Sequence, residues 1–377
     1  MPDNVNGGGI PANFRAKEPP FRVVKRAELP FKKLVIFYAI SILVAAFIGG
    51  VFIALNGVNP FAYFKEVFSG CFRSGVAFRG LVRIIVPLLM VSLGVILAFK
   101  MKYWNIGAEG QLIMGAVFAT WASRSFPGLP TPIMLIVMAA AGIIGGGLWG
   151  LITAFFKCRF NTNETLFTLM LNYVAFYIVD YLRNGPWQAD PGFPGIGRLA
   201  ANSRLPQLFR LDISWIVAIA LLFFIYVYLN YTKQGYEISV VGDSISTARY
   251  AGMNVNRIIR RTMFMSAGIC GLAGMLKVSG AVSNYTLDTG IAAGVGFTAI
   301  SVAWLAKLNP FGVFVVSFLF GVLEKGCSVA ESTFHLSAAV TEILQGLILF
   351  TILGSDFFIR YKLQRTAGRR KLGEHNN

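Results

Sequence analysis

The sequence predicts an all-α polytopic membrane protein that crosses the bilayer about ten times. The 377 residues are 55% hydrophobic and only 14% charged, whereas soluble domains carry about 25% charged residues. Apolar runs of roughly 20 residues, enough to cross about 30 Å as a helix, recur along the chain. Basic residues gather at the ends of these runs, which is typical of membrane proteins with a positive-inside charge bias.

The net charge of +17 does not indicate a nucleic-acid partner, because the basic residues flank apolar segments instead of forming a patch of their own. Cys71, Cys158, Cys270 and Cys327 are scattered without metal or redox spacing. The chain has only two histidines, too few for a His-based catalytic or metal constellation. We therefore expect no catalytic site, no metal site and no cofactor bound by this chain.

The N-terminal part predicts a tail, two spans and a helix at the membrane surface. Residues 1–33 are polar and rich in Gly and Pro, and they lack the apolar stretch of a cleavable signal peptide. We expect a flexible cytoplasmic tail there. Residues 34–55 and 81–99 are apolar throughout and predict spans. Between them, residues 56–80 place aromatic side chains at helical spacing, which favours a short interfacial helix.

A polar segment from Trp104 to Gln111 separates the second and third spans. Glu109 lies at or near membrane depth, where an ionisable side chain is costly and by default marks a functional or packing site. Gly107 and Gly110 allow a backbone break or a close helix approach. Two interpretations of Glu109 remain open here, a hydrogen-bonding or gating residue and a carboxylate that couples transport to ions.

The later spans complete a transmembrane domain over residues 34–355, followed by a basic cytoplasmic tail at 356–377. The row Gly142, Gly146 and Gly150 predicts close packing against another helix. A capping pattern from Asn161 to Glu164 predicts the start of the fifth span. The span at 291–306 is short enough to be broken or re-entrant. The apolar runs lie at 112–121, 133–156, 165–181, 213–231, 262–281, 291–306, 311–325 and 337–353.

Charge bias predicts the orientation of these spans. An even number of spans puts both termini on one side, and Lys and Arg are more frequent on that side, which predicts cytoplasmic termini. The basic segment 232–261 then lies in the cytoplasm, and the long polar segment 183–212 lies outside. Loops of that length are often functional.

The cytoplasmic segment contains a short predicted helix from Ser244 to Ala251. Asp243 or Ser244 can cap its start and Gly252 its end. Such a helix, connected to spans on both sides, could act as a lever moved by a partner, or it could be an ordinary interfacial helix. We call it the coupling helix. Its residues are Ser244, Ile245, Ser246, Thr247, Ala248, Arg249, Tyr250, Ala251 and Gly252.

Intramembrane polar side chains are the candidates for a translocation path or a gate. The alternative role for each is a hydrogen bond between helices, a modest contribution of about 0.6 kcal/mol on average. The candidates are Asn105, Glu109, Gln111, Thr168, Asn172, Glu342 and Gln345.

Several segments, taken in order, resemble the membrane subunits of ABC importers that serve simple sugars, branched-chain amino acids and nucleosides. Residues 105–111 (NIGAEGQ) resemble the signature of the nucleoside and simple-sugar branch. Residues 163–164 with 168–173, 242–253, 294–300 with 309–312, and 345–347 resemble further blocks of the family. The coupling helix departs from the family, which often has Asn-Pro and a double Ala where this chain has Ser244-Ile245 and Thr247-Ala248.

The resemblance implies a permease subunit that moves a nucleoside or simple sugar across a bacterial plasma membrane. The chain has no G-x-x-x-x-G-K-[ST] loop for ATP phosphates, so ATP and magnesium would bind a separate ATPase, with two fused nucleotide-binding domains. The long N-terminus is similar to the longer permease of bacterial nucleoside importers, which implies a sister permease in a heterodimer. An external substrate-binding lipoprotein would deliver the solute. The alternative is a secondary transporter in which Glu109 or Glu342 couples to protons or sodium.

Overall fold

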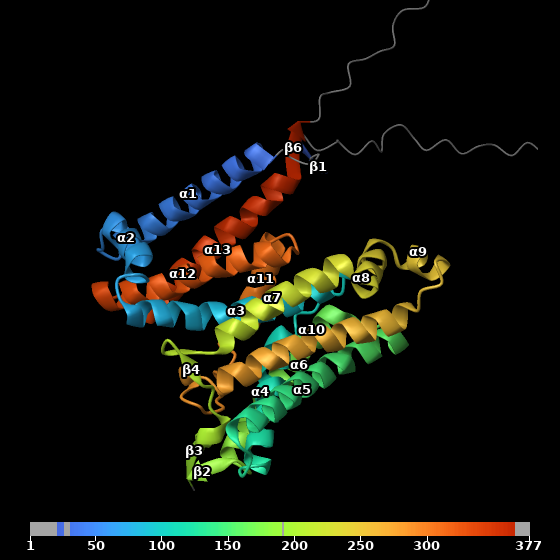
Figure 1. The fold of residues 1–377 in the computed structure, drawn as a ribbon. Helices are drawn as coiled ribbons and strands as arrows, with labels where there is room; N and C mark the ends of the chain where they lie inside the picture. The colour runs from blue at the N-terminus through green and yellow to red at the C-terminus, as the bar shows by residue number, and fades with distance from the viewer. Residues whose placement is uncertain (1–20, 26–30, 191, 366–377) are drawn as a thin grey trace, which may run out of the picture. The chain divides into compact units, whose positions relative to one another are not determined.

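The computed structural model describes residues 21–25, 31–190 and 192–365, and within them the chain is almost entirely helical (Figure 1). Its helices are α1 (Phe31–Leu55), α2 (Pro60–Gly70), α3 (Gly75–Lys100), α4 (Ala108–Ser125), α5 (Thr131–Phe160), α6 (Glu164–Asn184), α7 (Ser214–Tyr231), α8 (Lys233–Asp243), α9 (Ile245–Tyr250), α10 (Val255–Val278), α11 (Val295–Leu305), α12 (Pro310–Phe334) and α13 (Ala338–Arg360). The 3₁₀ turns are η1 (Ala201–Ser203) and η2 (Ala281–Ser283).

The strands form three small two-stranded antiparallel sheets. β1 (Phe21–Lys25) pairs with β6 (Tyr361–Arg365), β2 (Gln188–Asp190) with β3 (Phe193–Ile196), and β4 (Gln207–Leu208) with β5 (Leu211–Asp212). Apart from β1–β6, the strands lie in the segment 183–212 that the sequence places outside the membrane. The all-α membrane fold class is therefore confirmed.

The number of spans differs from the expected ten. Among the described residues, five helices are long and apolar enough to cross a membrane, namely α3, α5, α6, α7 and α12, or six if α1 and α2 are counted as one bent span. Two of the other expected spans differ from a full span for identifiable reasons. α10 carries four basic residues, and α11 has only 11 residues, about 16 Å at 1.5 Å per residue.

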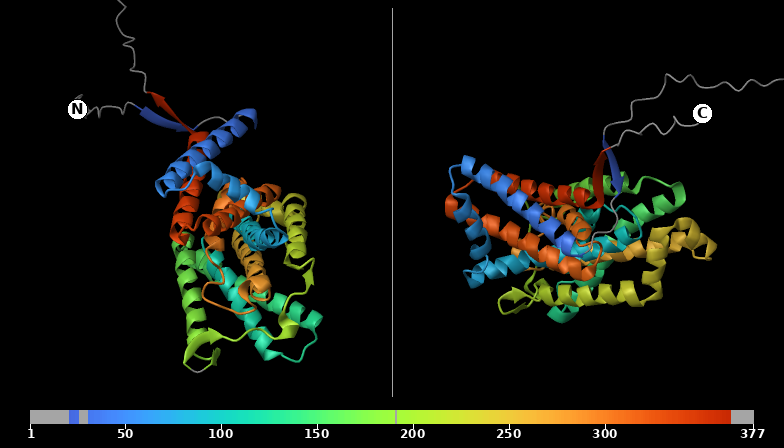
Figure 2. Two further views of the ribbon diagram at one scale, coloured as in Figure 1. Left: turned by 90° about the vertical axis from the view of Figure 1, so that its left-hand side faces the viewer. Right: turned by 90° about the horizontal axis from the view of Figure 1, so that it is seen from above.

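The chain divides into two compact units, Met1–Phe52 with Gly346–Asn377, and Ile53–Gln345. Within the first unit, β1 and β6 lie side by side (Figure 2) and pair from Phe21 opposite Arg365 to Lys25 opposite Tyr361. The expected tails at 1–33 and 356–377 fall largely on residues 1–20, 26–30 and 366–377, which lie outside the described residues. Inside the described part, α13 extends to Arg360 and leads directly into β6.

α3 and α10 form the centre of the second unit. α3 is buried on all sides from Ile85 to Phe99, as expected for a run of apolar residues without a polar face. α10 packs against α3, α4 and α5, and Figure 1 shows it running beside α5. This packing depends on small residues. A Cβ atom at Gly146 would meet Ala267 O and Gly271 Cα, and one at Gly150 would meet Ala267 Cβ. The predicted small-residue row therefore packs closely on a helix, and that helix is α10.

The start of α6 lies two residues beyond the predicted cap. Asn163 is the N-cap, and its side chain accepts hydrogen bonds from the backbone N–H groups of Thr165 and Leu166. Asn161 instead ends α5 in the left-handed conformation, with φ 51°. Both positions suit asparagine, which caps helix starts and tolerates the left-handed region. The sequence pattern alone therefore did not show which asparagine starts the helix.

Candidate functional site

The segment from Asn105 to Gln111 folds into a polar junction at the start of α4. Asn105 and Gln111 exchange hydrogen bonds through their side-chain amides, with both nitrogen–oxygen distances at 3.1 Å. Asn105 Oδ1 also accepts from the backbone N–H of Gly107 at 3.0 Å. Asn105 is fully buried and Gln111 is 1% exposed. Because the side-chain amides of Asn105 and Gln111 satisfy each other, these two polar side chains can be buried at the start of α4.

α6 supplies the second side of the junction. Thr168 Oγ1 accepts from the backbone N–H of Ile106 at 3.1 Å. The amide of Asn172 donates to Ile106 O at 2.9 Å and accepts from the backbone N–H of Gly110 at 2.8 Å. A Cβ atom at Gly110 would lie 2.9 Å from Asn172 Oδ1, so only glycine allows this approach. Thr168 and Asn172 are one helical turn apart and both face the junction.

Glu109 joins the starts of two helices. Its carboxylate accepts hydrogen bonds from the backbone N–H groups of Gly294 at 2.8 Å and Gly296 at 2.6 Å. These groups belong to the N-terminal turn of α11, and Glu109 itself lies in the first turn of α4. Helix N-termini carry partial positive charge, which stabilises a carboxylate there. The partner of Glu109 is thus peptide backbone 185 and 187 residues further along the chain.

Five of the seven polar candidates lie in this junction, and two lie elsewhere. Asn105, Glu109, Gln111, Thr168 and Asn172 are buried together. Glu342 is exposed and Gln345 half-buried, and both lie on α13. The hydrogen bonds of the junction connect α4 to α6 and to α11. The junction therefore holds three helices together.

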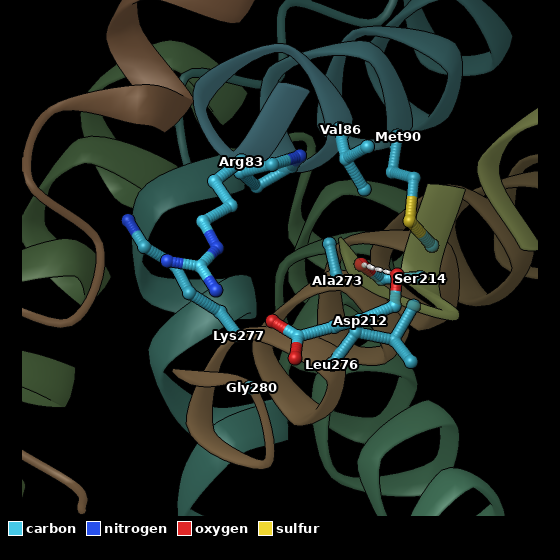
Figure 3. A pocket seen from close by; sticks show the side chains of 10 residues that line it. Arg83, Val86, Met90, Asp212, Ser214, Ala273, Leu276, Lys277 and Gly280 are labelled. Atoms are coloured by element: carbon cyan, nitrogen blue, oxygen red, sulfur yellow. Dashed lines mark hydrogen bonds between the residues drawn. The ribbon is translucent and has the colours of Figure 1, made fainter. Parts of the chain in front are cut away.

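A second polar cluster was missed by the sequence reasoning. Arg83 projects from α3 toward Asp212 in a cavity at the start of α7, and Lys277 of α10 lines the same cavity (Figure 3). The signal was present in the sequence, because Lys277 falls inside an apolar run and intramembrane charges mark functional sites by default. Lys277 also interacts electrostatically with Glu109 and with Glu324 of α12.

The coupling helix forms as a short separate helix, α9. Ser244 caps it by accepting from the backbone N–H of Thr247 at 3.2 Å, and Gly252 follows it with φ +74°. Tyr250 is 93% exposed. Only Ala248 in this helix is buried, so most of the surface of α9 is free of contacts within the described chain.

α8 connects α9 firmly to the spans. Gly242 at its end lies directly against Lys100 O at the end of α3, where any side chain would clash. Glu237 of α8 forms a salt bridge of 3.0 Å with Arg261 of α10. A displacement of α9 therefore reaches both α3 and α10 through short, packed connections.

Together, the spanning helices, the buried polar junction and the exposed helix tied to two spans define a multi-pass membrane transport subunit. The chain matches the family described as "Branched-chain amino acid transport system / permease component" over residues 76–353. It therefore belongs to this family of permeases.

Named relatives agree with the family assignment. The "Glucose ABC transporter permease protein TsgB13" of Haloferax volcanii is 30% identical, covering 88% of this chain and 90% of the relative. The "Guanosine ABC transporter permease protein NupP" of Bacillus subtilis is 29% identical, covering 85% and 93%. The "Guanosine ABC transporter permease protein NupQ" of the same organism is 27% identical, covering 72% and 88%.

These findings confirm the resemblance to ABC importer permeases. The chain is an ABC transporter permease subunit, a transport component and not an enzyme. They favour this interpretation over an ion-coupled secondary transporter, in which Glu109 or Glu342 would have carried the coupling ion.

Proposed function

We propose that the chain carries a nucleoside or simple sugar inward across a bacterial plasma membrane as one permease of an ATP-driven importer. The relatives named for guanosine and glucose transport support this substrate class. The observation that carries the mechanism is the exposed helix α9, fixed through α8 to α3 and α10. ATP and magnesium bind a partner ATPase, which has two fused nucleotide-binding domains.

Each proposed partner is assigned from a related chain or from an exposed part of the permease. Two related chains from one organism, NupP and NupQ, resemble this chain, which supports a heterodimer with a sister permease. The ATPase docks on the coupling helix, where Ile245 and Tyr250 offer exposed apolar and aromatic surface. An external substrate-binding lipoprotein docks on the segment 183–212. In Figure 1 the β2–β3 hairpin of that segment and α9 lie at opposite ends of the second unit.

Both termini lie on the cytoplasmic side in this proposal. The antiparallel pairing of β1 with β6 supports a common side, since paired strands cannot lie on opposite faces of a membrane. Charge bias supports the cytoplasmic assignment, because basic residues gather on the side of the termini.

The translocation path passes between the two permease subunits, and the polar junction serves as part of its gate. Asn105, Glu109, Gln111, Thr168 and Asn172 hold the starts of α4 and α11 in place. α11 is too short to cross the bilayer, and half-length helices of this kind often border a substrate path. Glu342 and Gln345 on α13 remain candidates for contact with the solute.

Uptake by the reconstituted complex tests this function. The chain is co-purified with the ATPase, sister permease and binding protein that this proposal requires, and uptake of radiolabelled guanosine or glucose into vesicles is measured with internal or external ATP. We expect ATP-dependent uptake that is lost when Ser244 to Ala251 is deleted while the complex remains assembled. Replacement of the exposed Lys65 by Gln is a control outside both the docking helix and the segment 183–212. Uptake driven by an ion gradient without the ATPase would refute the proposal.

A further inference from the structure

The β4–β5 hairpin, residues 207–212, projects an aromatic and a cationic side chain from the start of α7. The pairing of residues 207–208 with 211–212 leaves Phe209 and Arg210 as the two-residue turn. Phe209 is 81% exposed. Arg210 is exposed too, and it forms no salt bridge with another described residue. Figure 1 shows β4 beside the start of α7, at the end of the second unit away from α9.

Both turn residues adopt a backbone conformation that their side chains disfavour. The φ angle is 56° at Phe209 and 61° at Arg210, the left-handed region that a type I′ turn requires at both central positions. Such turns favour Asn-Gly, because glycine has no Cβ atom and asparagine tolerates this region. A bulky aromatic residue there is an outlier. Strained positions cluster at functional sites, which indicates that these two side chains serve a purpose at the tip.

The base of the hairpin is fixed to the ends of two helices. Asp212 is 5% exposed, and one of its oxygens accepts from the backbone N–H of Ala281, just beyond α10, at 3.1 Å. Gln207 Nε2 donates to its other oxygen at 3.3 Å. The backbone N–H of Ile213 donates to Pro206 O at 3.1 Å. The tip is therefore held in a defined place relative to α7 and α10.

The length of α7 sets the depth of the tip. The helix has 18 residues, about 27 Å at 1.5 Å per residue, slightly less than the hydrocarbon core of about 30 Å. Its first residue, Ser214, therefore lies at the edge of the hydrocarbon. The lipid headgroup layer beyond that edge is about 5–7 Å deep, and two strand residues span about 7 Å. Phe209 and Arg210 thus lie at the depth of the lipid headgroups.

The chemistry of the tip fits that depth. An aromatic ring is apolar enough to enter the acyl boundary, and the exposed surface of α7 is apolar from its first turns, at Ile216, Ile219 and Phe223. A guanidinium group binds phosphate oxygens through two parallel hydrogen bonds, and the long stem of arginine lets its charge reach them. A soluble partner would cover Phe209 only while docked, whereas lipid covers it at all times.

We propose that the β4–β5 hairpin is a lipid anchor. Phe209 inserts at the edge of the hydrocarbon, and Arg210 binds the phosphate of a phospholipid headgroup. The anchor fixes the start of α7 and, through Asp212, the end of α10 at the membrane surface. It involves neither the solute nor the ATPase, so it goes beyond the proposed function and is tested without it.

A depth measurement tests the position of Phe209. The full chain is reconstituted in vesicles of phosphatidylcholine and phosphatidylglycerol, with a nitroxide attached at Phe209→Cys. The control carries it at Phe193→Cys in the β2–β3 hairpin, where Phe193 is 76% exposed. Both chains also carry Cys158→Ser, because the other three native cysteines are buried. We expect collisions with oxygen, which concentrates in lipid, to dominate at position 209, and collisions with a water-soluble nickel chelate to dominate at position 193.

Two results of this measurement would contradict the anchor. In the first, the chelate reaches both labels equally, which places the tip in water. In the second, the label at position 209 is shielded from the chelate only after a substrate-binding protein is added, which makes the tip a protein docking surface.

Thermal unfolding tests the contact of Arg210 with phosphate. The unfolding midpoint of the full chain is measured in dodecyl maltoside, whose headgroup has no phosphate, and in nanodiscs of the same two phospholipids. The gain in midpoint on transfer to nanodiscs should be smaller for Arg210→Gln than for wild type. Arg198→Gln changes an exposed cation of the same segment outside the hairpin and should keep the full gain.

A turn-preserving variant separates lipid binding from folding. Phe209→Asn combined with Arg210→Gly places the preferred pair in the type I′ turn, so the hairpin should form without strain and still lose part of the gain. If both hairpin variants keep the wild-type gain, or lower the midpoint equally in detergent and nanodiscs, the tip has a structural role only and the inference is wrong.

Discussion

Replacement of Glu109 by Gln tests the joint between α4 and α11. The carboxylate accepts from Gly294 N at 2.8 Å and from Gly296 N at 2.6 Å. A glutamine amide offers one oxygen, so it can keep one of these bonds, and its NH₂ group then faces the other N–H. The variant loses one charge-assisted bond, about 1.5–3 kcal/mol, and leaves a buried N–H without a partner, about 1–3 kcal/mol.

We therefore expect Glu109→Gln to destabilise the protein by about 2.5–6 kcal/mol, as the sum of these two effects. The assay is thermal unfolding of the purified protein in detergent, followed by ATP-driven uptake of the folded fraction. Asp190→Asn makes the same change from carboxylate to amide at the exposed end of β2 and should leave unfolding unchanged. If Glu109→Gln unfolds like wild type but abolishes uptake, then the charge serves transport directly and the structural reasoning is wrong.

Three further changes probe other contacts. Asn172→Leu should destabilise the protein by about 2–4 kcal/mol, because its hydrogen bonds to Ile106 O and to the backbone N–H of Gly110 in the first turn of α4 are lost; thermal unfolding measures this, and an unchanged midpoint contradicts it. Gly146→Ala should lower the unfolding temperature, because its Cβ would meet Gly271 Cα and prevent close packing of α5 on α10. Gly346→Ala on α13 is the control: nothing lies within 4 Å of the added Cβ, so this change should be neutral or slightly stabilising in the same assay. Tyr250→Ala should reduce the uptake per ATP hydrolysed without lowering the unfolding temperature, because the side chain is 93% exposed; an unchanged ratio of uptake to hydrolysis argues against docking at this residue.

Local patterns predicted the fold class and the helices well, because apolar periodicity and capping residues act over short distances. α9 forms where Ser244 and Gly252 predicted it, and the glycine row of α5 packs as its spacing indicated. The expected number of about ten spans is not confirmed, since a run of apolar residues does not reveal whether a helix crosses fully. α11 shows the difference, being apolar but only 11 residues long.

The contacts of the candidate site could be predicted only in part. Membrane depth indicated that Glu109 needs a donor, but its partners are backbone groups more than 180 residues away, and no side chain in the sequence marks them. The cluster of Arg83, Lys277 and Asp212 is likewise assembled from three separate helices or loops. Long-range contacts of this kind follow from packing, which a single sequence does not display.

α10 connects the coupling helix to the rest of the second unit, and its packing restricts how it can move. Gly271 lies against the backbone of Gly115 and Gly142, and Gly274 lies directly against Leu112 O. Backbones in such close contact cannot slide past one another without clashes, since protein interiors transmit strain and deform little. α10 must therefore move together with α4 and α5 as one body. A force applied at α9 would then reach Lys277 and the polar junction as a displacement of the whole group, consistent with rigid-body switching in packed helical proteins.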